Sequence, residues 1–307
     1  MIIRTIAARP IVPIEVTKKG VRVMRLEDYP TEPRFTAKVL STEEITEEGT
    51  DIEVRELILG LENHQFDFEI GQSIGVLVES SGDFGHTVHH RLYTVADTPK
   101  DSGNPEITIV VRRCNYIDDY SGEQFIGVNS NFLCDRKPGE EVTITGPFGM
   151  PFKVPEDKNA NLLLIGLGTG IAPFRALVKH IYKNVGDWKG KVRLLYGAHS
   201  GLELLYMNGK RDDFTNYYDE ETFEAFKALS PRPNWADPIA WDFAIEDRAD
   251  EIWRMLEDEH TYIYIAGQKS IRDALDELFG EMAESDAVWA KKKADLIEQG
   301  KWAELLY

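Results

Sequence analysis

Between Asn161 and Pro173 the chain reads Asn-Leu-Leu-Leu-Ile-Gly-Leu-Gly-Thr-Gly-Ile-Ala-Pro. The apolar run at its start is typical of a strand that is buried on both faces of a parallel sheet. The glycines that follow let the backbone turn sharply and approach a ligand without a Cβ in the way. Pro173 suits the first turn of a helix, and the free N–H groups at that helix end would bind a diphosphate. The spacing is not the usual GxGxxG, so this prediction depends on the strand before the turn and the helix after it.

The rest of the second half alternates strands and helices in the same way. Further apolar strands are predicted at 192–198 and 261–266, and helices at 174–185, 246–258, 270–284 and 286–299. Such alternation predicts a doubly wound parallel sheet. The last residues, from Trp302 to Tyr307, are either a loose tail or a segment that lies across a flat cofactor.

The first half has a different pattern. Short alternating or β-branched runs, separated by Gly, Pro, Asn and Asp, occur at 35–40, 54–59, 73–78, 92–95, 106–111 and 141–145. This pattern predicts antiparallel strands in a barrel or a sandwich. The boundary between the two halves falls near 150–158, where Pro151 and Pro155 interrupt the chain.

Two motifs in the first half suit a phosphorylated, flat ligand. In Arg91-Leu92-Tyr93-Thr94, Arg91 and Tyr93 share a strand face, so a guanidinium that can clamp a diphosphate lies beside a ring that can stack. The Thr94 hydroxyl could reach a ring nitrogen. The alternative is an ordinary strand with one surface arginine. In Gly127–Cys134, Ser130 opens a predicted helix whose free N–H groups suit a phosphate. The alternative is that the segment is simply a capped helix.

The composition excludes several classes of function. A formal net charge of −18 over 307 residues argues against nucleic-acid binding, which needs a basic footprint. The two cysteines, Cys114 and Cys134, are too few for an iron–sulfur cluster and are expected to be reduced thiols. No apolar run approaches the about 18 residues of a membrane span, and the N-terminus lacks signal-peptide features, so the expected location is the cytoplasm.

The N-terminal segment, residues 1–34, differs from the rest in charge. It holds seven Lys or Arg against four acids, a local balance of +3. It is either a solvated extension or a segment that steers an acidic protein partner.

Taken together and in this order, the motifs resemble the plant-type ferredoxin–NADP(H) reductase family over residues 35–307. Gly71–Val76 is similar to the family's GQSIGV strand, Arg91–Thr94 to RLYS, Gly127–Cys134 to GVCSNFLC and Gly168–Pro173 to GTGIAP, and Tyr307 matches its terminal tyrosine. Part of the C-terminal half, including Ser230-Pro231-Arg232-Pro233, resembles the reductase component of benzoyl-CoA oxygenase, which carries an iron–sulfur module that this chain lacks.

The resemblance implies an antiparallel FAD-binding β-barrel at 35–155 and a doubly wound NAD(P)-binding α/β domain at 156–307, after a basic extension at 1–34. It implies an FAD enzyme that transfers electrons between NADP(H), with NAD(H) left open, and a separate carrier such as ferredoxin or flavodoxin. Two alternatives remain. One is the reductase component of an oxygenase system, and the other is an FAD-binding structural or docking subunit of a larger redox complex.

The resemblance also assigns roles to individual residues. Arg91 would hold the FAD diphosphate, Tyr93 would stack on the isoalloxazine, and Thr94 would bond to flavin N5. Tyr307 would cover the flavin face, so Thr94 and Tyr307 are the candidate catalytic residues. The other candidate cofactor-binding residues are Leu92, Arg112, Tyr116, Gly127, Val128, Asn129 and Ser130 for FAD, and Gly168, Thr169, Gly170, Ser200 and Gly267 for the nicotinamide nucleotide.

The chain departs from the family pattern near the nicotinamide. Ala266 replaces a cysteine, and Leu305 replaces an acid, with Glu304 one step off and expected to face elsewhere. The pair that selects the 2′-phosphate has no clear counterpart, which leaves Lys210, Arg211 and Arg232 as candidate phosphate partners. The histidines His86, His89 and His90 are expected to be incidental residues of a loop, not metal ligands.

Overall fold

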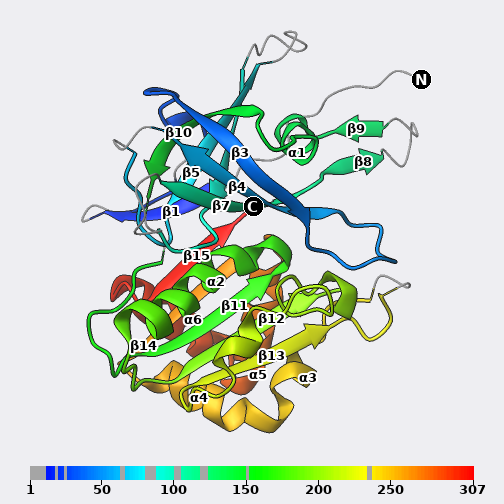
Figure 1. Ribbon diagram of the computed structural model, residues 1–307. Coiled ribbons are helices and arrows are strands. Elements are labelled where there is room, and N and C mark those ends of the chain that lie inside the picture. Colours follow the sequence, from blue (N-terminus) through cyan, green and yellow to red (C-terminus); the bar gives the residue numbers. More distant parts are fainter. Residues whose placement is uncertain are drawn as a thin grey trace.

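The computed structural model describes residues 12–17, 20–23, 26–62, 66–79, 88–99, 105–117, 124–149, 152–233 and 237–307. The chain forms two halves, an antiparallel sheet at the top of Figure 1 and a parallel sheet flanked by helices at the bottom.

The first half is a six-stranded antiparallel sheet. Its strands are β3 (Phe35–Glu44), β4 (Val54–Leu61), β5 (Ser73–Glu79), β6 (Val88–Thr94), β7 (Glu106–Arg112) and β10 (Glu141–Phe148), in the spatial order β6-β5-β10-β3-β4-β7. A bridge between Val95 and Ile109 joins the two ends of this order, so the sheet curls into a barrel. All the strands predicted here are present, and the prediction of a barrel or sandwich is confirmed as a barrel.

The barrel core follows the alternation of the sequence. Alternate residues such as Leu57 and Leu59 on β4 and Ile107 and Ile109 on β7 are fully buried in one apolar cluster. Helix α1 (Val128–Cys134) closes the barrel with Leu133 and Cys134. It is preceded by the short pair β8 (Asn115–Ile117) and β9 (Gln124–Ile126).

The second half contains a five-stranded parallel sheet. Its strands are β11 (Asn161–Leu167), β12 (Val192–Ala198), β13 (Phe223–Leu229), β14 (Thr261–Gly267) and β15 (Trp302–Leu306), in the order β13-β12-β11-β14-β15. Helix α2 (Ile171–Lys179) covers one face, where Leu162 and Leu164 of β11 are buried. The other face buries Leu163 and Ile165, and it is covered by α3 (Trp241–Ile245), α4 (Ala249–Glu257), α5 (Ser270–Met282) and α6 (Asp286–Glu298). The doubly wound prediction is confirmed.

Several local predictions need correction. The helix predicted at 174–185 ends as an α-helix at Lys179 and continues as a π-helical turn from His180 to Val185. Strand β13 is not predicted from the sequence. The chain end is not a loose tail, because β15 pairs with β14 and its residues Leu305 and Leu306 are buried.

The N-terminal segment joins the second half. Strand β1 (Val12–Thr17) runs antiparallel to β15, with Val12 opposite Leu306, and β2 (Gly20–Val23) pairs with β1. The N-terminal segment therefore includes a hairpin that extends the sheet of the second half, and the two alternatives for its charged side chains stay open. Residues 1–11, 18–19 and 24–25 lie outside the described part of the chain.

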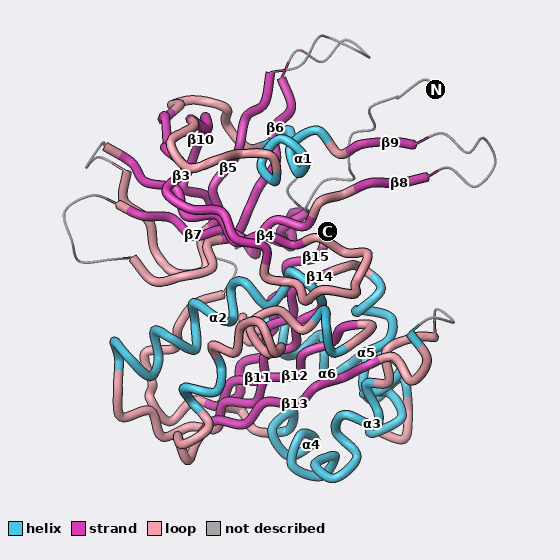
Figure 2. The backbone as a smooth tube through the Cα atoms, turned by 45° about the vertical axis from the view of Figure 1, so that its right-hand side comes forward, coloured by secondary structure: helices cyan, strands magenta, loops and turns pink. Residues whose placement is uncertain are grey.

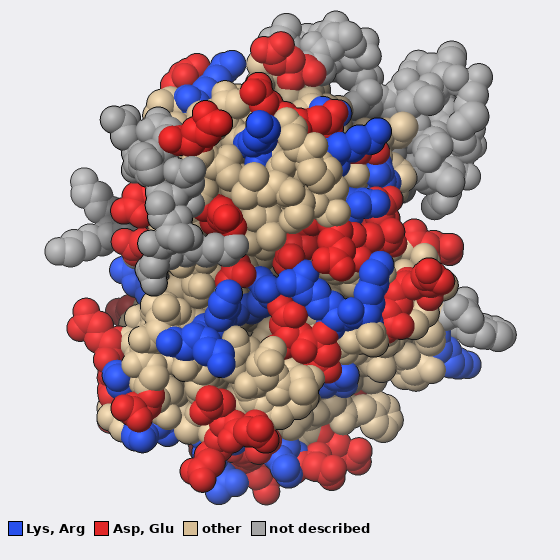
Figure 3. Space-filling model, viewed as in Figure 1, with Lys and Arg blue, Asp and Glu red and all other residues tan. Residues whose placement is uncertain are grey.

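A network of charged side chains joins the two halves, and we call it the interdomain ion network. Arg175 of α2 lies 2.6 Å from Asp213 and 3.3 Å from Asp97, which follows β6. The guanidinium groups of Arg175 and Arg211 both lie over the ring of Tyr206, and its hydroxyl donates to Glu56 of β4 at 2.6 Å. The network comprises Glu56, Asp97, Arg175, Lys179, Tyr206, Arg211 and Asp213. Figure 3 shows basic side chains in a band across this waist of the molecule.

Candidate functional site

A cavity of about 390 Å³ lies between the two halves, and both halves line it. On the second half its wall is the turn Gly168–Gly170, which follows β11. The chain runs outward from β11 through β12 to β13 and then crosses back to β14 on the other side of β11, so this turn lies where the strand order of the parallel sheet reverses. Ligands of doubly wound folds bind at that switch point. On the first half the wall comes from β6, the end of β7 and the start of α1.

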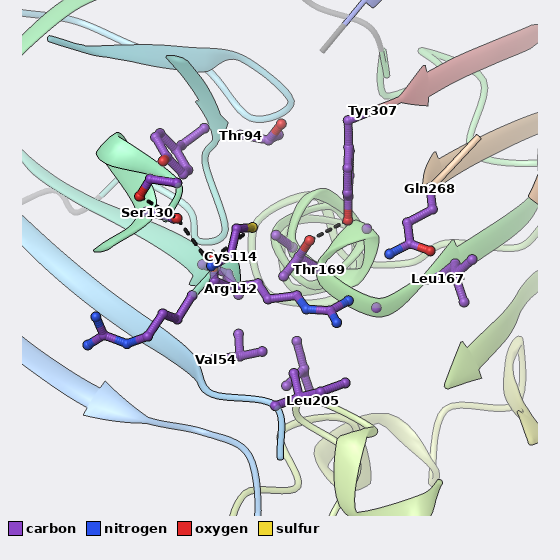
Figure 4. A pocket seen from close by; sticks show the side chains of 18 of the residues that line it. Val54, Thr94, Arg112, Cys114, Ser130, Leu167, Thr169, Leu205, Gln268 and Tyr307 are labelled. Carbon is purple, nitrogen blue, oxygen red and sulfur yellow. Dashed lines mark hydrogen bonds between the residues drawn. The ribbon is translucent and has the colours of Figure 1, made fainter. Parts of the chain in front are cut away.

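Most of the predicted site residues meet in this cavity. It is lined by Arg91, Leu92, Tyr93, Thr94, Arg112, Gly127, Val128, Asn129, Ser130, Gly168, Thr169, Gly170 and Tyr307. Figure 4 shows Thr94, Arg112 and Ser130 on the barrel side, facing Thr169 and Tyr307. The side chain of Tyr116 lies outside the described part of the structure, although its backbone is in β8.

Strand β6 presents the residues Arg91–Thr94 as its alternation predicts. His90 and Leu92 are buried, while Arg91 and Tyr93 are half-buried and line the cavity. Burial raises the pKa of Tyr93 far above its usual value, so the ring stays neutral. The hydroxyls of Thr94 and Ser73 lie 3.1 Å apart, which fixes Thr94 at the end of the strand.

The start of α1 is fixed by side chains that bind backbone groups. The Ser130 hydroxyl donates to the carbonyl of Gly127 and accepts from the N–H of Cys114, each at 3.2 Å. The Asn129 amide donates to the carbonyls of Val76 at 2.9 Å and His89 at 3.2 Å. The first-turn N–H groups of α1 have no partner within the helix, so they are available to an anion at this wall.

The glycine turn is shaped by close packing. Gly168 has φ of +58°, which favours glycine, and a Cβ at Gly170 would lie 2.0 Å from the carbonyl oxygen of Ala266. Gly170 is therefore required so that the turn can pack on β14. Thr169 projects from this turn, and its hydroxyl bonds to the phenol of Tyr307 (Figure 4).

Tyr307 lies between the two halves, at the end of the red strand β15 in Figure 1 and at the label C in Figure 2. Its N–H donates to Gly267 at 3.1 Å, and its carbonyl accepts from the N–H of Lys269 at 3.2 Å. Burial raises the pKa of its phenol, although the bond to Thr169 opposes the shift. The backbone of Tyr307 is thus held on both sides, and its ring is held by the bond to Thr169.

Two predicted residues lie beside the cavity and do not line it. Ser200 donates to Glu203 at 3.2 Å, and it is Glu203 and His199 that line the cavity. Gly267, with φ of +141°, packs its backbone on Leu167, and the next residue, Gln268, lines the cavity.

Of the predicted loop histidines, two are in the described part and both lie in strand β6. His89 lines the cavity, and it alternates with Arg91 and Tyr93, so the same period of two could have identified it. His90 faces the barrel and lies 3.1 Å from the Thr145 hydroxyl, and burial lowers its pKa. His86 lies outside the described residues. In the described ranges no group of His, Cys, Asp and Glu could hold a metal ion.

The candidate 2′-phosphate partners have neighbours of their own. Arg211 pairs with Glu56 at 2.7 Å in the interdomain ion network, and Lys210 donates to the Thr46 carbonyl at 3.2 Å. The remaining candidate, Arg232, is exposed and pairs with Asp237 at 2.8 Å.

The departures from the family pattern are visible in the site. Leu305 lines the cavity, and Glu304 faces the other side of the sheet as expected, where it accepts from Arg272 and Trp302, each at 2.8 Å. Ala266 is fully buried opposite Gly166. The cavity therefore has neither a thiol nor a carboxylate at these two positions.

The fold and the site define a two-domain flavin- and nicotinamide-binding oxidoreductase, and family models agree. An oxidoreductase FAD-binding domain matches residues 38–152, and an oxidoreductase NAD-binding domain matches residues 164–277. A chloroplastic ferredoxin–NADP reductase, leaf isozyme 1, of Oryza sativa subsp. japonica is 30% identical, with 98% of this chain and 84% of the relative covered. The ferredoxin–NADP reductase of Thermosynechococcus vestitus is 31% identical, with 86% and 70% covered. The chain belongs to the ferredoxin–NADP reductase family.

Solved structures agree on the fold. The ferredoxin–NADP⁺ reductase from Plasmodium falciparum superposes with a TM-score of 0.67 at 19% identity, with 91% of this chain and 98% of that chain covered. Among the helices that the structure describes, none is long and apolar enough to cross a membrane.

Proposed function

We propose that this chain is an FAD-dependent oxidoreductase that transfers electrons between NADP(H) and a separate one-electron carrier such as ferredoxin. The observation that carries the proposal is the single cavity lined by both the Arg91–Thr94 strand and the Gly168–Gly170 turn. A flavin held by one wall and a nicotinamide nucleotide held by the other would meet there. The relatives named above are ferredoxin–NADP reductases, which supports this pairing of substrates.

The residues of the barrel wall fit FAD. Arg91 provides a guanidinium for the diphosphate, and the first turn of α1 provides N–H groups for the same charge. Tyr93 provides a neutral ring for stacking, and the Thr94 hydroxyl provides a hydrogen-bonding group at the end of the strand. When bound, FAD supplies the exchange between hydride and single-electron transfer. The protein contributes binding, alignment and the exclusion of water.

Tyr307 controls access to the site. Its phenol is protonated at neutral pH, because burial raises its pKa, and it bonds to Thr169 of the glycine turn. Because the backbone of Tyr307 is held by Gly267 and Lys269, the ring gives way to nicotinamide by rotating about its own side-chain bonds. The ring shields the site from water until the nucleotide displaces it.

The carrier is a separate protein. The chain has two cysteines, one exposed and one buried, and cannot ligate a cluster of its own. Ferredoxin or flavodoxin is the first candidate. An oxygenase component is the second, favoured by the resemblance of Ser230–Pro233 to an oxygenase reductase.

The test begins with the purified protein. Its visible spectrum is recorded, with FAD added if the protein is colourless, and NADPH or NADH is then added without oxygen. We expect a yellow protein that bleaches, with NADPH more effective than NADH, and that afterwards reduces added ferredoxin or flavodoxin. A protein that cannot bind FAD contradicts the proposal. A yellow protein that is inert to both nucleotides supports a structural FAD subunit instead, and reduction of an oxygenase component alone supports the second carrier.

A further inference from the structure

A tyrosine outside the cavity joins two of its walls. Tyr196 of β12 is fully buried and does not line the cavity. Its hydroxyl donates to the carbonyl of Gly168 at 3.0 Å and accepts from the N–H of Leu205 at 3.1 Å. Gly168 and Leu205 both line the cavity. One phenol thus holds the glycine turn and the segment that leads into the interdomain ion network at Tyr206.

The bond to Gly168 fixes the orientation of a peptide plane. A trans peptide is planar, with its C=O and the following N–H pointing in opposite directions. Because Tyr196 and the N–H of Ile171 hold the Gly168 carbonyl away from the cavity, the N–H of Thr169 is directed the opposite way. Thr169 is in the first turn that follows β11, where N–H groups have no partner within the helix.

The turn needs such support. Gly170 packs on β14, but Gly168 has φ of +58° and nothing lies within 4 Å of the place where its Cβ would be, so the start of the turn has more room than its end. Glycine also has the widest choice of backbone conformations. Burial raises the pKa of Tyr196 far above its usual value, so its hydroxyl keeps its proton and remains a donor at any working pH.

We propose that Tyr196 is a positioning residue for the nicotinamide dinucleotide. It holds the Gly168 carbonyl in the core, so that the N–H of Thr169 faces the dinucleotide phosphates. This inference rests on the proposed function. It assigns no contact between Tyr196 and any ligand, since the phenol acts through the peptide.

A pair of matched variants tests the role. Tyr196→Phe keeps the ring and removes both hydrogen bonds. The control is Tyr264→Phe on β14, on the other side of β11, where a buried tyrosine donates its phenol to the Lys153 carbonyl at 2.6 Å, away from the cavity. The dissociation constant of NADP⁺ is measured by calorimetry on each FAD-loaded protein, together with KM, kcat, the flavin spectrum and the melting temperature.

We expect Tyr196→Phe to raise the dissociation constant and KM about three- to tenfold, the range of one or two net hydrogen bonds. The kcat at saturating nucleotide should stay within twofold of the wild type. The flavin spectrum should be unchanged. Tyr264→Phe should lower the melting temperature comparably and leave the dissociation constant within twofold.

Two results would overturn the role of Tyr196 and leave the proposed function intact. One is a dissociation constant within twofold of the wild type in Tyr196→Phe. The other is an equal rise in both variants, which would reflect a general loosening of the domain. A wild-type protein that binds neither NADP⁺ nor NAD⁺ would instead overturn the proposed function, and the role of Tyr196 with it.

Discussion

Arg91 is a strand residue whose position follows from the sequence. It alternates with buried His90 and Leu92, so its guanidinium is directed to the cavity and not to the barrel core. The same alternation places Tyr93 beside it. These two positions could be predicted because a strand of period two fixes its side-chain directions locally.

Replacement of Arg91 tests the flavin wall. We expect Arg91→Ala to weaken FAD binding on the order of 30- to 100-fold, since a hydrogen bond to a charged group contributes about 1.5–3 kcal/mol. The measurement is a titration of apoprotein with FAD, followed by the quenching of flavin fluorescence. Arg136→Ala is the control, because Arg136 stacks on Phe132 away from the cavity. An Arg91→Ala protein that binds FAD like the wild type would remove Arg91 from the site.

The bond between Tyr307 and Thr169 predicts that a substitution at Tyr307 strengthens nucleotide binding, whereas Arg91→Ala weakens FAD binding. Tyr307→Phe keeps the ring but loses this bond, so the ring is displaced more easily. We expect KM for NADPH to fall, by at most about tenfold, which is the upper value for one neutral hydrogen bond. Steady-state kinetics with NADPH checks it, and Tyr262→Phe, on the neighbouring strand β14 and outside the cavity, serves as control. A higher KM would mean that the phenol itself holds the nucleotide.

Ser200 and Gly267 mark the limit of residue-level prediction. Neither residue lines the cavity, because loops do not fix the direction of side chains as strands do. Here the neighbours His199, Glu203 and Gln268 face the cavity instead. The partners that decide this, such as Leu167 against Gly267, are distant in the sequence.

Strand β15 was not predicted because its local sequence points elsewhere. Trp302-Ala303-Glu304-Leu305-Leu306 is rich in good helix formers, as is Phe223–Leu229 of β13. Both become strands because a parallel neighbour is available, β14 for one and β12 for the other. Strands β11, β12 and β14 could be predicted because their apolar runs are short and each reaches a glycine near its end, and β14 is also rich in β-branched and aromatic residues.

Glu304 anchors β15, and hence the position of Tyr307. Its buried carboxylate accepts from Trp302 and Arg272. We expect Glu304→Gln to lower the free energy of unfolding by about 2–3 kcal/mol. This loss is smaller than the one expected from breaking a fully buried ion pair, because Arg272 is partly exposed. Urea unfolding measures the loss. Asp237→Asn, which breaks the exposed pair with Arg232, should cost less than about 1 kcal/mol. Equal losses in the two variants would show that Glu304 has no special role.

The interdomain ion network makes the joint between the two halves depend on pH. Burial alone would raise the pKa of Asp97, but the hydrogen bond from Lys179 and the charge of Arg175 outweigh it and lower the pKa. A depressed pKa means that the ionised carboxylate stabilises the folded protein above its ordinary pKa. This stability is lost as pH falls through the lower, folded value.

Asp97→Asn should therefore reduce the stability of the folded protein most at neutral pH. We expect it to reduce the free energy of unfolding by about 2 kcal/mol at pH 7 and to approach the wild type below about pH 4. Urea unfolding at a series of pH values checks this, with the exposed Asp219→Asn as control. A difference from the wild type that stays constant from pH 7 to pH 3 would contradict the assigned role of the carboxylate.

The pairing of β1 with β15 has a consequence for the order of folding. β1 lies ahead of the barrel in the sequence, and β15 is synthesised after every other strand described. The contact between them spans nearly the whole chain, and contacts so distant in sequence form late in folding because they close the longest loop. On the ribosome the barrel is complete long before β15 emerges, since domains fold as they are made. The first strand must therefore wait, unpaired with β15, until β15 has been made, and only then does the N-terminal hairpin join the sheet of the second half.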